Sequence, residues 1–186
     1  MLVELVKTAA ADGVRLDGAL TPPQGAAPKG ARADAILCLH GAGANFYGSS
    51  LFEEIARQVS QSGIATLRAN TRGHGALSLS SNQVGKRTQG AAYEIVADCV
   101  HDITAWLELL AKRGFPRIAL VGHSLGAVKS LYSQANQAAA SVTAIAALSP
   151  PRLSYLAFRN AMSSQFFDCI SRAEELVAAG QGETLM

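Results

Sequence analysis

The chain has 186 residues, enough for one domain that buries about 70% of the surface of its unfolded state. Hydrophobic residues make up 49% of the chain and charged residues 16%, which excludes an intrinsically disordered protein. The formal net charge is +2 and no basic run exceeds a Lys-Arg pair, so we expect no nucleic-acid partner.

The cysteines and the N-terminal stretch bear on cellular location. Three widely spaced cysteines, Cys38, Cys99 and Cys169, exclude a disulfide framework and favour a reducing compartment. The first apolar stretch contains Glu4 and has no basic lead-in, unlike a secretion signal. No apolar run reaches the roughly 18 residues that a membrane-spanning helix needs. We therefore expect a soluble, cytoplasmic protein without a membrane partner; the sequence does not predict its oligomeric state.

The first elements are predicted from alternation and turn residues. Residues 2–8 and 14–20 alternate apolar and polar side chains, and Asp12-Gly13 between them is typical of a hairpin turn. After a connection rich in proline and glycine, residues 35–39 are wholly apolar. Such a run is typical of a strand that helices cover on both faces.

The rest of the chain alternates helices and strands. Ser50 and Glu53 have the spacing of a capping box at a helix start, and an apolar stripe from Ile95 to Leu110 has the spacing of one helical face. The expected order is helix 50–61, strand 64–69, loop 75–90, the helix with the stripe, strand 117–121, helix 125–136 and strand 142–148. This alternation predicts an α/β fold, a mostly parallel doubly wound sheet with helices on both faces, whose ligands bind beyond the carboxyl ends of the strands.

One pentapeptide lies at such a strand end. Gly122-His123-Ser124-Leu125-Gly126 joins strand 117–121 to helix 125–136, the context of a nucleophile elbow. A strand that turns sharply into a helix strains the serine backbone, and side chains larger than hydrogen two positions to either side would collide. The pentapeptide alone is a weak signal, but the apolar strand before it and the helix after it make a chance match about tenfold less frequent. It predicts Ser124 as a nucleophile.

A second glycine-rich turn, starting at His40-Gly41, follows strand 35–39 at the same end of the sheet. Acyl transfer needs two N–H donors aimed at the oxyanion, and the backbone N–H groups of Ala42 and Leu125 are the candidates. The alternative is a dinucleotide-binding loop. That loop requires Gly or Ala where Phe46 stands and an acidic residue at the end of the next strand, which ends in Asn70 instead.

These motifs, in this order and spacing, resemble the α/β-hydrolase superfamily, in its esterase and lipase-like branch, over nearly the whole chain. Arg72-Gly73-His74-Gly75 is similar to the Arg-Gly-x-Gly turn of that family. The resemblance implies that Ser124 attacks an acyl carbon, that a histidine is the base and that an acid orients the histidine. It implies no cofactor and no metal, and a small-molecule acyl substrate. We expect the turns of the site to be shaped by His40, Gly41, Gly122, His123 and Gly126.

Other polar residues have plainer interpretations. We expect His40 and His74 to tie loops together by hydrogen bonds, and the ring of His123 to point away from the serine hydroxyl. Asp98, His101 and Asp102 share one helix face at a spacing that could hold a metal. No further His or Cys lies nearby to complete the ligands, which favours a solvated helix face.

We expect residues 1–151 to form the hydrolase core and residues 152–186 to begin a helical lid or cap. The aromatic residues of 152–186 fit core packing and an acyl pocket equally well. In the family the acid and the histidine follow the nucleophile, yet no histidine follows His123. Six strands are predicted where the family usually has eight, so the C-terminal strands are missing and strand 142–148 is an uncovered edge. We therefore expect an N-terminal fragment of a longer enzyme that is inactive alone.

The sequence thus predicts a serine hydrolase that cleaves a small carboxylic ester or a related acyl compound through an acyl-serine intermediate. The alternative is a non-catalytic protein of the same fold that binds a ligand or a partner. The identity of the substrate is beyond the sequence, because this fold hosts many reactions.

Overall fold

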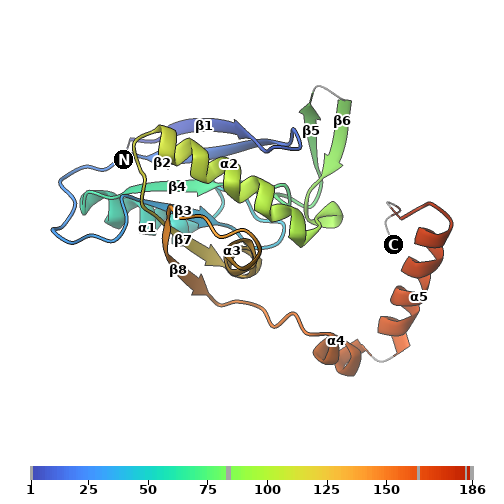
Figure 1. The fold of residues 1–186 in the computed structure, drawn as a ribbon. Helices are drawn as coiled ribbons and strands as arrows, with labels where there is room; N and C mark the ends of the chain where they lie inside the picture. Colours follow the sequence, from blue (N-terminus) through green and yellow to red (C-terminus); the bar gives the residue numbers. More distant parts are fainter. Residues whose placement is uncertain (1, 83–84, 163, 183, 185–186) are drawn as a thin grey trace. The chain divides into compact units, whose positions relative to one another are not determined.

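A computed structural model describes residues 2–82, 85–162, 164–182 and 184. The chain divides into two compact units, Met1–Pro150 and Pro151–Met186. The first unit holds a six-stranded sheet in the order β1-β2-β4-β3-β7-β8 and a separate two-stranded sheet, β5-β6 (Figure 1). Its elements in chain order are β1 (Glu4–Ala9), β2 (Arg15–Thr21), β3 (Ala35–Leu39), α1 (Ser50–Gln61), β4 (Ala65–Ala69), β5 (Ser78–Asn82), β6 (Gly85–Gln89), the 3-10 turns η1 (Ala91–Tyr93) and η2 (Val96–Asp98), α2 (Cys99–Lys112), β7 (Ile118–His123), α3 (Leu125–Asn136) and β8 (Val142–Leu148).

The main sheet confirms the predicted α/β class. β1 and β2 form the expected antiparallel hairpin, with Gly13 at a φ of 85° in its turn, a value that a residue without Cβ adopts freely. β2 pairs with β4 in antiparallel orientation, and β4, β3, β7 and β8 are parallel. The carboxyl ends of these four strands therefore meet at one edge of the sheet, and the predicted site residues lie there, at the ends of β3 and β7 and in the turns that follow them.

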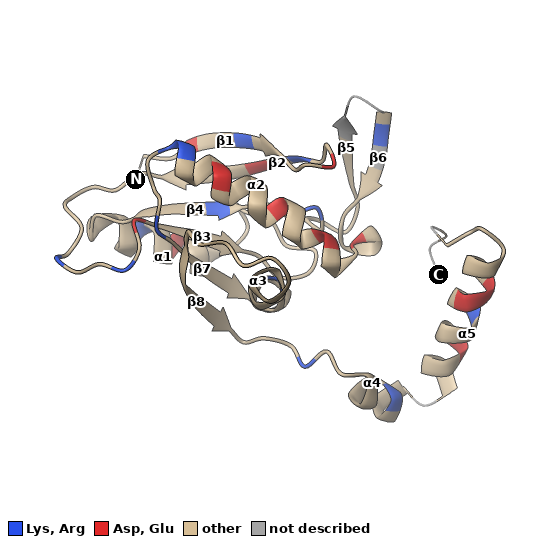
Figure 2. Ribbon diagram, in the orientation of Figure 1, with Lys and Arg blue, Asp and Glu red and all other residues tan. Residues whose placement is uncertain are grey.

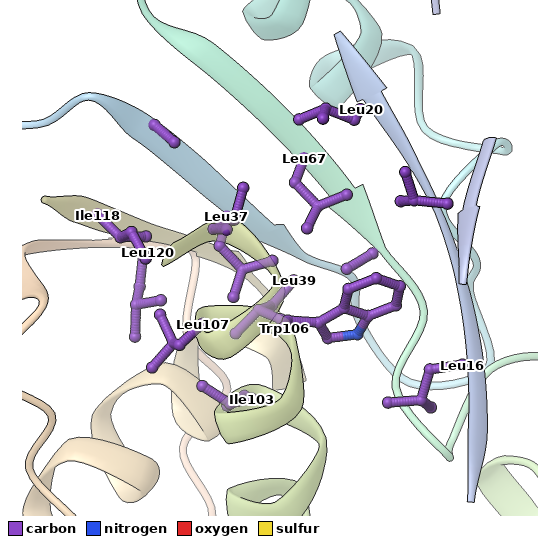
Figure 3. Packing of buried hydrophobic residues seen from close by; sticks show 14 of the residues in the cluster. Leu16, Leu20, Leu37, Leu39, Leu67, Ile103, Trp106, Leu107, Ile118 and Leu120 are labelled. Atoms are coloured by element: carbon purple, nitrogen blue, oxygen red, sulfur yellow. The ribbon is translucent and has the colours of Figure 1, made fainter. Parts of the chain in front are cut away.

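Helices cover both faces of the sheet, which explains why β3 is wholly apolar. Leu37 and Leu39 on one face join the large core cluster around Trp106 of α2 (Figure 3). Cys38 on the other face packs with Phe52 of α1. Full burial of each such aliphatic side chain contributes roughly 1.5 to 3 kcal/mol. β3 is thereby held firmly in place, and the loop that follows it starts from a fixed position.

Three local predictions need correction. The N-cap of α1 is Ser49, whose hydroxyl accepts a hydrogen bond from the N–H of Phe52. The prediction placed the N-cap of the capping box at Ser50, one residue too far along the chain. The helix expected to start at Ile95 begins at Cys99 instead, after the 3-10 turn η2. Ile95 is 57% exposed and therefore does not belong to the apolar face of the helix. The expected loop 75–90 contains the hairpin β5-β6, whose polar strands lack the apolar alternation by which strands are recognised.

One edge of the main sheet lies at β8, as predicted. β8 pairs only with β7 in the described sheet, and its five central residues are exposed. The strand carries no charged side chain (Figure 2). Natural proteins commonly use charges, prolines or covering elements to protect such an edge from other strands. β8 has no charge or proline of this kind.

The second unit consists of α4 (Tyr155–Met162) and α5 (Ser164–Ala178). The ring of Phe166 packs edge-on against Tyr155 at 5.1 Å and lies parallel to Phe158 at 6.5 Å between ring centroids. Tyr155, Phe158 and Phe167 nevertheless stay exposed. None of the described helices of the chain is long and apolar enough to cross a membrane.

Candidate active site

Ser124 occupies the turn between β7 and α3 in a backbone conformation that side chains rarely adopt. Its φ is 54° and its ψ is −125°. Strain of this kind costs on the order of 1 to 3 kcal/mol and is concentrated at functional sites. The N–H of Ser124 donates to Leu148 O at 2.9 Å, so β8 supports the turn.

The structure gives the steric reason for the two glycines around Ser124. A Cβ on Gly122 would collide with the carbonyl of Gly126. A Cβ on Gly126 would collide with the carbonyl of Leu39 and lie 2.6 Å from that of His40. Both contacts are with backbone, which cannot move aside without displacing β3 or α3.

The loop after β3 passes directly beside the serine. A Cβ on Gly41 would lie 3.0 Å from Cβ and 3.4 Å from Oγ of Ser124. The carbonyl of Gly41 accepts hydrogen bonds from the N–H of Ala44 at 3.2 Å and from the His40 ring at 2.7 Å. Because a peptide unit is planar and trans, the N–H of Ala42 points opposite to that carbonyl.

The backbone N–H groups of Ala42 and Leu125, the two candidate oxyanion donors, have no hydrogen-bond acceptor among the described residues. Within the described part of the chain, the N–H of Ala42 makes no hydrogen bond, and Ala42 is exposed. Leu125 is the first residue of α3, where an N–H group has no intrahelical partner. The helix N-terminus adds a favourable field for developing negative charge.

His40 is buried behind this loop and is 1% exposed. Its Nε2 accepts a hydrogen bond from the N–H of Thr71 at 3.1 Å, so the ring proton is on Nδ1, which donates to Gly41 O. Burial, with the nearby charge of Lys129, lowers the pKa of His40 to about 4. Because both ring nitrogens are engaged, His40 is not free to act as a base toward Ser124.

The other histidines do not complete a catalytic pair either. Nδ1 of His74 is hydrogen-bonded to Thr71 O at 3.0 Å, and His101 is exposed on α2. His123 is exposed and lines an open pocket of about 430 Å³ together with Ala44, Asn45, Gly48, Ser49, Ser50 and Leu51. Among the described residues, no histidine is hydrogen-bonded to the hydroxyl of Ser124.

The solvated helix face predicted on α2 is wrong for Asp102, which is fully buried. Its carboxylate accepts from Nη2 of Arg72 at 2.8 Å and from the backbone N–H of Arg72 at 2.8 Å. Nη1 of Arg72 also contacts Asp12 at 2.8 Å and Asp98 at 3.2 Å. The spacing on α2 therefore serves an ion-pair cluster, and no group of acidic, His or Cys side chains in the described residues is arranged to hold a metal ion.

Sequence reasoning missed a buried charge pair behind the site. Lys129 of α3 is fully buried, and its Nζ lies 2.5 Å from Oε1 of Glu94 and 2.9 Å from Oγ1 of Thr71. The Glu94 carboxylate occupies the space that a Cβ on Gly73 would need. A signal existed: Lys129 lies three residues after Gly126 and four residues before Ser133, on the small-residue face of the predicted helix.

A family model described as the alpha/beta hydrolase family matches residues 36–184. Among solved structures, the esterase Pf2001 of Pyrococcus furiosus aligns with a TM-score of 0.61 at 21% identity, over 86% of this chain and 55% of the esterase. The alpha/beta hydrolase GrgF of Penicillium sp. aligns with a TM-score of 0.63 at 20% identity, over 94% and 56%.

Est1E of Butyrivibrio proteoclasticus, solved with ferulic acid bound, aligns with a TM-score of 0.62 at 20% identity, over 83% of this chain and 57% of Est1E. The chain therefore spans about half the length of these structures, and at such identities the likeness shows the fold alone. No curated protein matches the chain.

Proposed function

Because the chain belongs to the alpha/beta hydrolase family, we propose that Ser124 is the nucleophile of a serine hydrolase that cleaves a small carboxylic ester or a related acyl compound. The observation that carries the proposal is the strained, positive-φ backbone of Ser124 at a strand-to-helix turn, with Gly41 close to its Oγ. A strained backbone that presents a hydroxyl group beside free N–H groups is suited to acyl transfer, because the N–H groups can stabilise the oxyanion that forms when the hydroxyl attacks.

In the proposed reaction, Oγ of Ser124 attacks the acyl carbon and its proton passes to a base. The N–H groups of Ala42 and Leu125 stabilise the negative oxygen of the tetrahedral intermediate. The alcohol leaves with a proton from the protonated base, and water then hydrolyses the acyl-serine. We assign the base and its orienting acid to chain beyond the described residues, since no described histidine is hydrogen-bonded to the hydroxyl of Ser124.

Several features support the finer assignments. The pocket of about 430 Å³ next to His123 suits a small substrate group. We assign residues 152–186 to the start of a lid on the basis of their exposed aromatic side chains. All three cysteines are free, which supports a cytoplasmic location.

A non-catalytic protein that binds a ligand or partner is the second candidate. It is favoured by the absence of a hydrogen bond between Ser124 and any described histidine. The two functions differ in whether the serine is activated, because only an activated serine reacts rapidly with a fluorophosphonate.

The test is therefore fluorophosphonate labelling of the full-length protein. We expect rapid labelling that Ser124→Ala abolishes and that Ser62→Ala, at an exposed position just after α1, leaves intact. A folded wild-type protein that fails to label at Ser124 would rule out the hydrolase and support the binding protein.

A further inference from the structure

Lys129 is a fully buried ammonium group less than two helical turns from the nucleophile. A buried charge is costly unless it is paired, and Glu94, whose side chain is 3% exposed, supplies the counter-charge. Neither Glu94 oxygen has a partner with hydrogen-bond geometry among the described residues, so this contact is an ion pair by distance. The directed hydrogen bond of Lys129 goes to Thr71.

The donor and acceptor capacities of Lys129, Thr71 and His40 decide where the protons lie between them. An ammonium group only donates, so Oγ1 of Thr71 accepts from Lys129 at 2.9 Å. The Thr71 hydroxyl hydrogen is then available to Nε2 of His40, 3.4 Å away, which also accepts from the N–H of Thr71. Both contacts keep Nε2 unprotonated, so the ring proton stays on Nδ1. The hydrogen bonds therefore run in one direction, from Lys129 to Thr71, from Thr71 to His40 and from His40 to the loop after β3.

The last donor in this chain fixes a peptide group. Nδ1 of His40 donates to Gly41 O at 2.7 Å, and the N–H of Ala44 donates to the same oxygen. Two donors restrict the direction of this carbonyl, and the planar trans peptide carries the restriction to the N–H of Ala42. That N–H is the proposed oxyanion donor.

We propose that Lys129 is a positioning residue of the active site, which acts through Thr71 and His40 to hold the N–H of Ala42 toward the oxyanion. This role rests on the proposed function. It requires no contact between Lys129 and substrate. Lys129 stabilises the transition state more than the bound substrate, because negative charge develops on the oxyanion only as the reaction proceeds. Loss of the role lowers kcat and leaves KM nearly unchanged.

The first test compares the turnover of p-nitrophenyl acetate by variants of the full-length protein. Thr71→Val keeps both charges of the ion pair and removes the hydroxyl link. We expect kcat to fall roughly tenfold, with KM within about threefold of wild type. Lys112→Met, at an exposed position on α2, is the matched control and keeps wild-type kinetics. A wild-type kcat in Thr71→Val overturns the proposal.

The second test separates positioning from simple stabilisation. Lys129→Met leaves the Glu94 charge buried and alone, and this variant is expected to lose melting temperature or to fail to fold. Lys129→Met combined with Glu94→Gln removes both charges. We expect this double variant to regain melting temperature but to keep a kcat roughly tenfold below wild type. Recovery of kcat together with melting temperature would mean that Lys129 only stabilises the fold.

A measurement independent of turnover follows the His40 ring by ¹⁵N NMR. Removing the Lys129 charge raises the pKa of His40, so the double variant titrates at higher pH than wild type, and Lys112→Met does not. An unshifted pKa in the double variant refutes the link from Lys129 to His40 and leaves the proposed function standing. A wild-type protein without turnover refutes the proposed function, and with it the catalytic role of Lys129, whatever the NMR result.

Discussion

Ala42 contributes a backbone N–H to the proposed site, so proline is the most specific substitution there. Ala42→Pro removes this donor. Loss of one oxyanion donor costs about 3 kcal/mol of transition-state stabilisation, so kcat of the full-length protein is expected to fall about a hundredfold or more. Ala42→Gly keeps the N–H and is expected to keep kcat within a few-fold. A folded proline variant with wild-type kcat would remove Ala42 from the site.

His40 makes stability depend on pH in a defined direction. Its pKa is about 4 in the fold against an ordinary value of 6.5, so between these values the unfolded chain binds more protons. The free energy of unfolding therefore decreases as pH falls from about 6.5 to about 4, by up to about 3 kcal/mol from this residue.

Urea unfolding at several pH values checks this dependence. The slope should be weaker in His40→Gln, which cannot titrate, and unchanged in His101→Gln, whose side chain is exposed. A His40→Gln slope equal to wild type would show that His40 titrates alike in both states.

At the residue scale, the sequence identifies groups whose motif is local. Ser124 and its two glycines lie within five positions, so their spacing, together with the strand before them and the helix after them, predicts their geometry. Lys129 and Glu94 are 35 positions apart, and Asp102 pairs with Arg72 across 30 positions. Nothing in the local pattern around such residues reveals their partner, because only the packed fold brings them together.

The strand-to-helix turn depends on the absence of side chains at its glycines. Gly126→Ala places a Cβ against the carbonyl of Leu39, and we expect it to lower the free energy of unfolding by at least about 2 kcal/mol. At Gly25 a Cβ would lie 3.5 Å from the carbonyl of Gln61, an ordinary contact. Gly25→Ala is therefore the control, with a change below about 1 kcal/mol. Equal stability of the two variants in urea would contradict the steric account.

At the element scale, elements with a strong apolar pattern were predicted from the sequence, whereas the helix cap of α1 and the polar hairpin β5-β6 were not. The apolar run of β3 and the alternation of β1 and β2 predicted these strands correctly. The cap of α1 could not be resolved, because Ser49 and Ser50 are neighbours and either suits an N-cap. The hairpin β5-β6 depends on backbone pairing and on contacts such as Arg15 N–H to Ser80 Oγ, which polar sequence does not reveal.

At the scale of the whole molecule, the described residues combine a sheet with an exposed edge at β8 and a proposed nucleophile, Ser124, to which no described histidine is hydrogen-bonded. We predict that the 186 residues alone hydrolyse p-nitrophenyl acetate near background. A chain extended along its own reading frame by about 80 to 100 residues, an estimate from typical element lengths, is expected to be active. Strong turnover by the 186 residues alone, lost on Ser124→Ala, would contradict this prediction.

The order of elements was predictable at this scale because strict alternation of helices and strands admits few topologies. The strand order β2-β4-β3-β7-β8 places β3 and β7 side by side, and this neighbourhood brings Gly41 to Ser124. The sequence could predict that both loops lie at one edge of the sheet. It could not predict the distance between them, which depends on the register of β3 and β7.

The central claim is that Ser124 forms a covalent acyl intermediate. Its most direct test is to mix full-length protein with p-nitrophenyl acetate, quench the reaction in acid within the first turnover and analyse the peptides by mass spectrometry. We predict an acetyl group on Ser124, absent from the Ser124→Ala variant and accumulating faster than in Ala42→Pro. Substrate turnover without acetyl on Ser124, or acetyl on another residue, would contradict the account.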